Sequence, residues 1–189
     1  MASRRSPGLM NPLDPRARAA MYYARKRRLA RIAASNGDGG GGGGGPVEST
    51  QWRIVMSDKL NTTYIWAEQL IFRTTAAGAQ QALDPSTGSA TATSELASYG
   101  IELAFDDTDT TNGWSSAANP SEPVIVEFTF DSAKTIVEFE FNFFSSTYGV
   151  GTYAIEAYVD DAWVEVFAET GLDTGAFPSG NRTVEVQSI

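Results

Sequence analysis

Two segments in the second half of the chain alternate apolar and polar side chains with a period of two residues. After their first residues, 124–130 and 136–141 place phenylalanines on one side and mainly acids on the other. A period of two is that of a β-strand with one buried face. The pattern therefore predicts strands packed against a core, with inward side chains Phe128, Phe130, Phe139 and Phe141.

Other segments between residues 46 and 189 are also enriched in β-branched and aromatic residues, which favours strands. The predicted strands are Gln51–Met56, Ile65–Arg73, Val124–Phe130, Thr135–Phe144, Tyr153–Val159, Trp163–Glu169 and Thr183–Val186. Turn-forming residues separate them, as at Asn119-Pro120 and Asp160-Asp161. Many short strands without a strong internal helix predict an all-β fold, a sandwich or jelly roll, over residues 46–189.

A glycine run sets this region apart from the N-terminus. Residues 37–45 are glycine except for Asp38, a composition that predicts a flexible linker. Residues 1–36 form a basic arm, in which one helix is predicted from about residue 15 to 35. Asp14 is the expected N-cap, Pro15 the first helical residue, and Asn36-Gly37 the stop.

Charge divides the chain at the same place. Nine of the 14 basic residues but only two of the 23 acidic residues lie in residues 1–45, which therefore carry a net charge of +7. The remaining residues carry −16, within a total of −9. A basic arm attracts phosphate or an acidic partner surface, whereas a uniformly acidic domain repels nucleic acid.

The arm helix has little reason to be stable alone, because arginines interrupt its apolar side. We expect it to order when it docks in an assembly, with its own sandwich as the rival docking surface. The predicted anchor residues are Arg16, Arg18, Met21, Tyr22, Arg25, Lys26, Arg27, Arg28, Leu29, Arg31 and Ile32.

Composition also excludes several classes of function. The chain has no histidine and no cysteine, so Ser-His catalysis, thiol nucleophiles and His or Cys metal sites cannot occur. Glu138 and Glu140 share one strand face, which we interpret as a solvated sheet surface rather than a glycosidase pair. We therefore predict that the protein is not an enzyme.

No stretch approaches the roughly 18 to 20 apolar residues of a membrane span, so no membrane association is predicted. The arginine-rich N-terminus is a poor signal peptide, and a mitochondrial presequence is the minor alternative.

Several segments carry motifs of one known family. The segment Ala104–Ser116 resembles a loop of the pattern "A-F-D-G-N, then T and W", and Tyr153–Val166 resembles a "D-G, W" hairpin. Both motifs are those of galactose-binding-like (discoidin-like) domains, and the resemblance implies a jelly-roll β-sandwich. Trp52-Arg53-Ile54 and Ala67–Arg73 resemble strands of versions common in phage proteins. Asp107 and Asp161 depart from the pattern, since glycine is usual at both positions.

The acidic loop carries hard oxygen ligands of the kind that Ca²⁺ prefers, at Asp106, Asp107, Asp109, Thr111 and Asn112. The resemblance implies a structural Ca²⁺ here, with a glutamate of the preceding strand completing its shell. The ligands so predicted are Glu68, Asp106, Asp109 and Thr111. The alternative is that the acids merely solvate a turn, with Asp106 capping backbone amides.

Aromatic residues suggest a further contact surface. Trp52, Trp66, Trp114 and Trp163 are expected mainly in the core rather than in a sugar-stacking platform. The segment Phe143–Gly149 is either an exposed patch that meets a glycan or a protein neighbour, or a buried corner.

These features together predict a virion structural protein of phage type, a capsid decoration, neck or tail-fibre component made in the host cytoplasm. Its arm would anchor it to other virion proteins and to copies of itself. One alternative is a carbohydrate-binding module for host or matrix glycans. Another is nucleic-acid binding through the basic arm.

Overall fold

The computed structural model describes residues 47–61, 63–75, 88–105 and 113–186. All of them belong to the second of two units into which the chain divides, Gly45–Ile189. The predicted arm helix and glycine linker lie outside the described residues, as do Asp106, Asp109 and Thr111.

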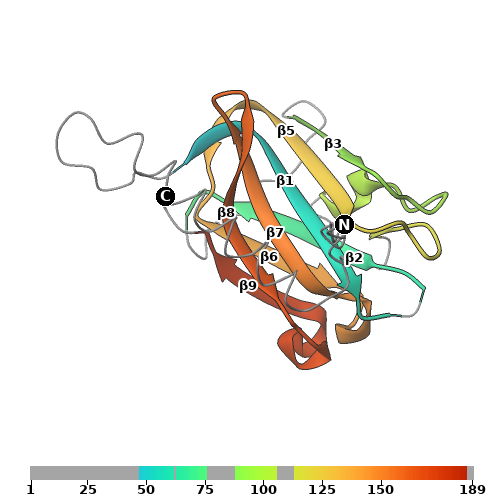
Figure 1. Ribbon diagram of the computed structural model, residues 1–189. Helices are drawn as coiled ribbons and strands as arrows, with labels where there is room; N and C mark the ends of the chain where they lie inside the picture. Colours follow the sequence, from blue (N-terminus) through green and yellow to red (C-terminus); the bar gives the residue numbers. More distant parts are fainter. Residues whose placement is uncertain (1–46, 62, 76–87, 106–112, 187–189) are drawn as a thin grey trace, which may run out of the picture. The chain divides into compact units, whose positions relative to one another are not determined.

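The described residues form two antiparallel sheets, which confirms the predicted all-β class (Figure 1). One sheet has the order β3 (Gly88–Ala92), β5 (Val124–Thr135), β1 (Glu48–Lys59), β7 (Val150–Val159) and β8 (Ala162–Thr170). The other has the order β4 (Trp114–Ser115), β2 (Trp66–Arg73), β6 (Glu138–Phe143) and β9 (Asn181–Glu185). Short 3₁₀ turns lie between strands: η1 (Ile101–Ala104), η2 (Ser146–Tyr148), η3 (Thr174–Ala176) and η4 (Pro178–Gly180). Within these ranges no helix has the length and apolarity needed to cross a bilayer.

The chain passes from one sheet to the other between consecutive described strands, except at the β7–β8 hairpin. Figure 1 shows the consequence, with β1, β5 and β7 crossing over β2 and β6. Each strand therefore turns one face toward a layer shared by both sheets, and that requirement produces the period-two pattern. We refer to the described residues in this arrangement as the sandwich.

Aromatic side chains fill this shared layer. Phe72 of β2 lies 6.4 Å from Trp52 of β1 and 5.6 Å from Phe128 of β5, between ring centroids. Phe141 of β6 meets Tyr153 of β7 at 4.6 Å. The four phenylalanines predicted to point inward are all buried, so the alternation identified the core face correctly.

Strand boundaries differ from the prediction where pairing extends a strand beyond its apolar pattern. Thr135 pairs with Glu48 of β1, so it continues β5, and β6 begins only at Glu138. β3 and β4 were not predicted, because β3 consists of small residues and β4 has only two. Both are held by pairing with longer strands.

The β7–β8 hairpin turns through Asp160-Asp161, as the sequence indicated. Val159 pairs with Ala162, and the two aspartates have φ of 50° and 60°. Positive φ at both central residues is typical of type I′ turns, which match the twist of the adjoining strands. Aspartate tolerates this conformation better than most residues, which explains why it can stand where glycine is usual.

Candidate functional site

A partly exposed aromatic cluster is a distinctive surface feature of the described residues. We call Trp66, Tyr99, Phe144 and Tyr148 the aromatic platform. Phe144 is 43% exposed, the largest fraction among the large hydrophobic side chains described. Its ring stacks on that of Trp66, with centroids 4.4 Å apart and planes 12° from parallel.

Main-chain contacts fix this stack in place. The Phe144 N–H donates to the carbonyl oxygen of Trp66 at 3.1 Å, directly after β6 pairs with β2. The preceding Phe143 is fully buried. Beyond η2, a Cβ at Gly149 would lie 3.1 Å from the Phe177 ring, so the loop returns tightly against the core. The exposed ring therefore stands on a loop held at both ends.

Tyr148 lies beside the stack rather than over it. Its centroid is 5.7 Å from that of Trp66 and 5.6 Å from that of Phe144, and its plane is steeply inclined to both. Equal distances to two stacked rings place a third ring at their side. Tyr99 meets only Trp66, edge-on at 5.6 Å. The face of Phe144 turned away from Trp66 is therefore covered by neither tyrosine.

The four tryptophans divide between core and surface. Trp52 and Trp114 are fully buried, and their indole N–H groups donate to the carbonyls of Ser49 and Ser94, each at 3.1 Å. Trp66 and Trp163 are half-buried, and the Arg53 guanidinium lies 4.3 Å from the Trp163 ring. The predicted core location is thus correct for two of the four.

The predicted calcium ligands are only partly described. Glu68 is the extra residue of a bulge in β2, where the register with β6 shifts between Ala67 and Gln69. A Cβ at Gly113 would lie 2.4 Å from the Glu68 Cα, so the residue that follows the acidic loop packs directly on this bulge. No group of three acidic side chains suited to a metal occurs among the described residues. The other predicted ligands, Asp106, Asp109 and Thr111, lie outside them.

Glu138 and Glu140 flank an arginine instead of facing solvent freely. Arg73 Nη1 lies 3.0 Å from Glu138 Oε1, and Nη2 lies 2.6 Å from Glu140 Oε2. Glu138 is buried, which corrects the prediction that both acids are solvated. Burial of Glu138 is possible because its carboxylate pairs with the Arg73 guanidinium.

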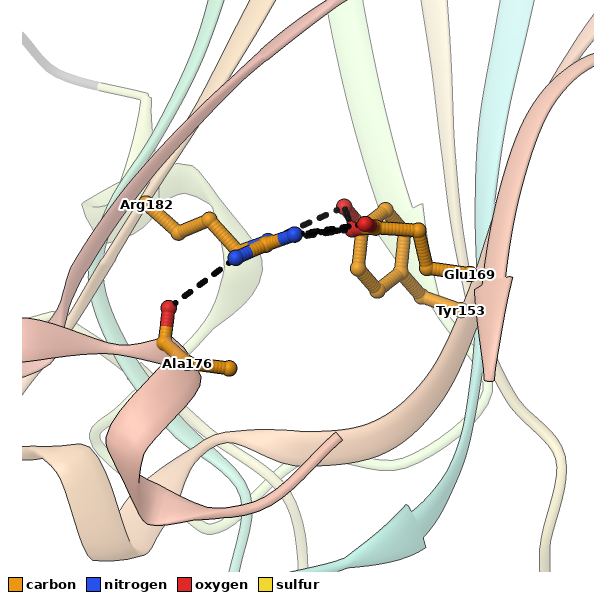
Figure 2. A network of polar contacts seen from close by, with 4 residues as sticks. All are labelled: Tyr153, Glu169, Ala176 and Arg182. Carbon is orange, nitrogen blue, oxygen red and sulfur yellow. Dashed lines mark hydrogen bonds and ion pairs between the residues drawn. The ribbon is translucent and has the colours of Figure 1, made fainter. Parts of the chain in front are cut away.

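A second polar network joins the two sheets through their edge strands β8 and β9 (Figure 2). Glu169 of β8 accepts a hydrogen bond from the Tyr153 hydroxyl at 2.5 Å. It also accepts from Arg182 of β9, whose Nη2 lies 2.6 Å from Oε1. Arg182 donates in addition to the Ala176 carbonyl at 3.2 Å. We call Tyr153, Glu169 and Arg182 the inter-sheet clasp.

The clasp shifts the titration of its members. Burial alone would raise the pKa of Glu169, but hydrogen bonds from Arg182 and Tyr153 outweigh burial and hold the pKa below its usual value. Burial, followed by the hydrogen bond to the Glu169 carboxylate, raises the pKa of Tyr153 well above its usual value. Both shifts favour an ionised glutamate beside a neutral tyrosine.

Sequence reasoning missed the clasp and recognised the platform only in part. The clasp residues are far apart in the chain and come from three strands, so no local motif marks them. Phe144 stood out as an aromatic residue beside serines and threonine, but its partner Trp66 was assigned to the core. All predicted anchor residues of the arm lie outside the described residues.

No protein-family model matches this chain, and neither does any curated protein or any solved structure.

Proposed function

We propose that this chain is a structural protein of a phage-type virion, anchored by its basic arm and displaying the sandwich outward or between subunits. The observation that carries the proposal is the separation of charge. Residues 1–45 hold +7, and the sandwich region holds −16.

The ion pairs of the sandwich sharpen this separation. Residues 46–189 contain only five basic residues. Arg53 binds Glu156 at 2.5 Å, Arg73 binds two glutamates, and Arg182 binds Glu169. Only two lysines lie outside these pairs. This distribution supports assigning the attraction to phosphate or to an acidic protein surface to the arm.

We also propose that the sandwich is a galactose-binding-like jelly roll. The motifs that suggested the family occupy compatible places: the segment that resembles the "D-G, W" hairpin forms the β7–β8 hairpin, and Trp114 pairs with Ala67. The passage of the chain between the two sheets also suits a jelly roll.

The proposed role is assembly and binding rather than catalysis. Histidine and cysteine are absent, and catalysis by paired carboxylates or by lysine remains possible. The most suggestive carboxylate pair, Glu138 and Glu140, is engaged by Arg73. That arrangement supports a structural role for the pair.

Mass spectrometry of particles purified from cells that produce this chain tests the proposal. The chain should co-sediment with the particles on a density gradient. Its recovery only at the top of the gradient would contradict a virion role. If the arm acts on nucleic acid alone, the full chain should instead bind DNA with an affinity that falls steeply as salt rises.

Carbohydrate binding is a second candidate function, which can coexist with the first. It is favoured by one specific observation, the exposed Phe144 ring supported from behind by Trp66. A protein displayed on a particle surface would have use for such a contact.

A further inference from the structure

We infer that the aromatic platform binds the apolar face of a neutral pyranose sugar, with Phe144 as the ring on which the sugar stacks. The inference deepens the second candidate function and is independent of anchoring by the arm.

The area of the exposed surface favours a sugar over a protein. Phe144 and Tyr158 are the only exposed large hydrophobic side chains among the described residues. An aromatic side chain can bury about 150–250 Å², so the 43% exposure of Phe144 leaves roughly 80 Å². A stable protein interface needs about 800 Å² on each partner. The exposed area of Phe144 is instead comparable to one face of a hexose.

The platform is already in the form that stacking requires. Trp66 lies behind Phe144, and the main-chain hydrogen bond between the two residues fixes their separation. Tyr148 limits movement of the stack from the side. A ligand therefore meets a ring that is already ordered, which lowers the entropic cost of binding.

Trp66 also carries a destabilising feature at this position. Its indole N–H is buried without a hydrogen-bond partner in the described structure. A buried donor without a partner is destabilising, and phenylalanine at the same place would have no such donor. Its broad indole ring supports Phe144 from behind, which explains why tryptophan occupies this position despite the unsatisfied donor.

The surroundings of the ring define the chemistry of the ligand. Ser145 Oγ and Thr147 Oγ1 lie 3.0 Å apart on the exposed loop, and Tyr148 adds a phenol. Hydroxyl groups both donate and accept hydrogen bonds, as sugar hydroxyls do. The segment 143–149 contains no charged residue, so the loop suits a neutral sugar better than a phosphate or a carboxylate.

Binding of the full chain to an array of neutral pyranose oligosaccharides tests this inference, followed by titration calorimetry with the best glycan. The array should include galactose, glucose, mannose and N-acetylhexosamine termini. Phe144→Ala and Phe144→Leu should each weaken binding at least about tenfold, which corresponds to about 1.4 kcal/mol. Phe144→Trp should retain binding because it keeps a flat ring.

Tyr158→Ala is the matched control, since Tyr158 is the other exposed aromatic residue, 37% accessible on β7. It should bind as the unaltered chain does. Thermal unfolding of each variant shows whether it folds. If Phe144→Ala does not fold, the comparison of Phe144→Leu with Phe144→Trp still decides the test.

Absence of binding to every glycan overturns the inference, as does unchanged affinity in Phe144→Leu. If no glycan binds but Phe144→Ala abolishes self-association in sedimentation, the ring belongs to a protein contact and the inference is equally overturned. None of these results bears on whether the arm anchors the chain, so the two proposals fail separately.

Discussion

Gly113 shows how one residue determines what can lie beside β2. A Cβ at this position would lie 2.1 Å from the Ala67 carbonyl oxygen and 2.4 Å from the Glu68 Cα, both of them backbone atoms. Only glycine allows so close an approach without moving a strand. The residue that follows the acidic segment 106–112 is therefore held at the Glu68 bulge.

This proximity supports the proposal that Glu68 completes a Ca²⁺ site with Asp106, Asp109 and Thr111. Chelation of the full chain with excess EGTA should then lower the melting temperature, and added Ca²⁺ should restore it. A ligand that binds only the native state stabilises it by RT ln(1 + [L]/Kd). Differential scanning calorimetry measures both changes.

Glu68→Ala and Asp106→Ala should each abolish the response to Ca²⁺, whatever their own melting temperatures. Asp131→Ala, which removes an exposed acid on β5, should leave the response intact. An identical melting curve with and without EGTA would show that the acids only solvate a turn.

At the scale of elements, alternation and residue type predicted the strands that carry the core. Val124–Phe130 buries every second side chain, so the alternation of apolar and polar residues in its sequence predicts burial directly. The sequences of β3 and β4 show no such alternation of large apolar residues, because the position of these strands depends on pairing with β5 and β2. The clasp was missed, and the platform recognised only in part, for the same reason, since each assembles side chains from distant parts of the chain.

The inter-sheet clasp should make stability depend on pH at the acidic side. The pKa of Glu169 is lowered in the folded protein, so its stabilising contribution is complete above the ordinary carboxyl pKa of about 4.3. That contribution is lost as the pH falls through the folded-state value. Glu169→Gln should cost about 1–2 kcal/mol at pH 7, and the difference from the unaltered chain should shrink toward pH 3.

The same clasp should also make the free energy of unfolding depend on pH in the alkaline range. The pKa of Tyr153 is raised on folding, so stability is retained below its ordinary value of about 10 and declines as the pH rises beyond it. Tyr153→Phe should remove that decline. Urea unfolding across the pH range measures both effects, with the exposed Glu127→Gln as control. A constant difference between Glu169→Gln and the unaltered chain from pH 7 to pH 3 would rule out the clasp as its source.

At the scale of the whole molecule, the chain combines a region that folds around its own core with a region whose charge suits a partner. The sandwich has a continuous aromatic core and an inter-sheet clasp of its own. The arm carries nine of the chain's 14 basic residues within residues 1–45. Such a division is expected when display and anchoring are performed by separate segments.

Deleting residues 1–36 and measuring the fraction of chain that co-sediments with particles tests this division most directly. The account predicts that the truncated chain unfolds cooperatively on heating, within a few degrees of the full chain, yet is lost from the particle fraction. Normal incorporation of the truncated chain would contradict anchoring by the arm and would assign assembly to the faces of the sandwich.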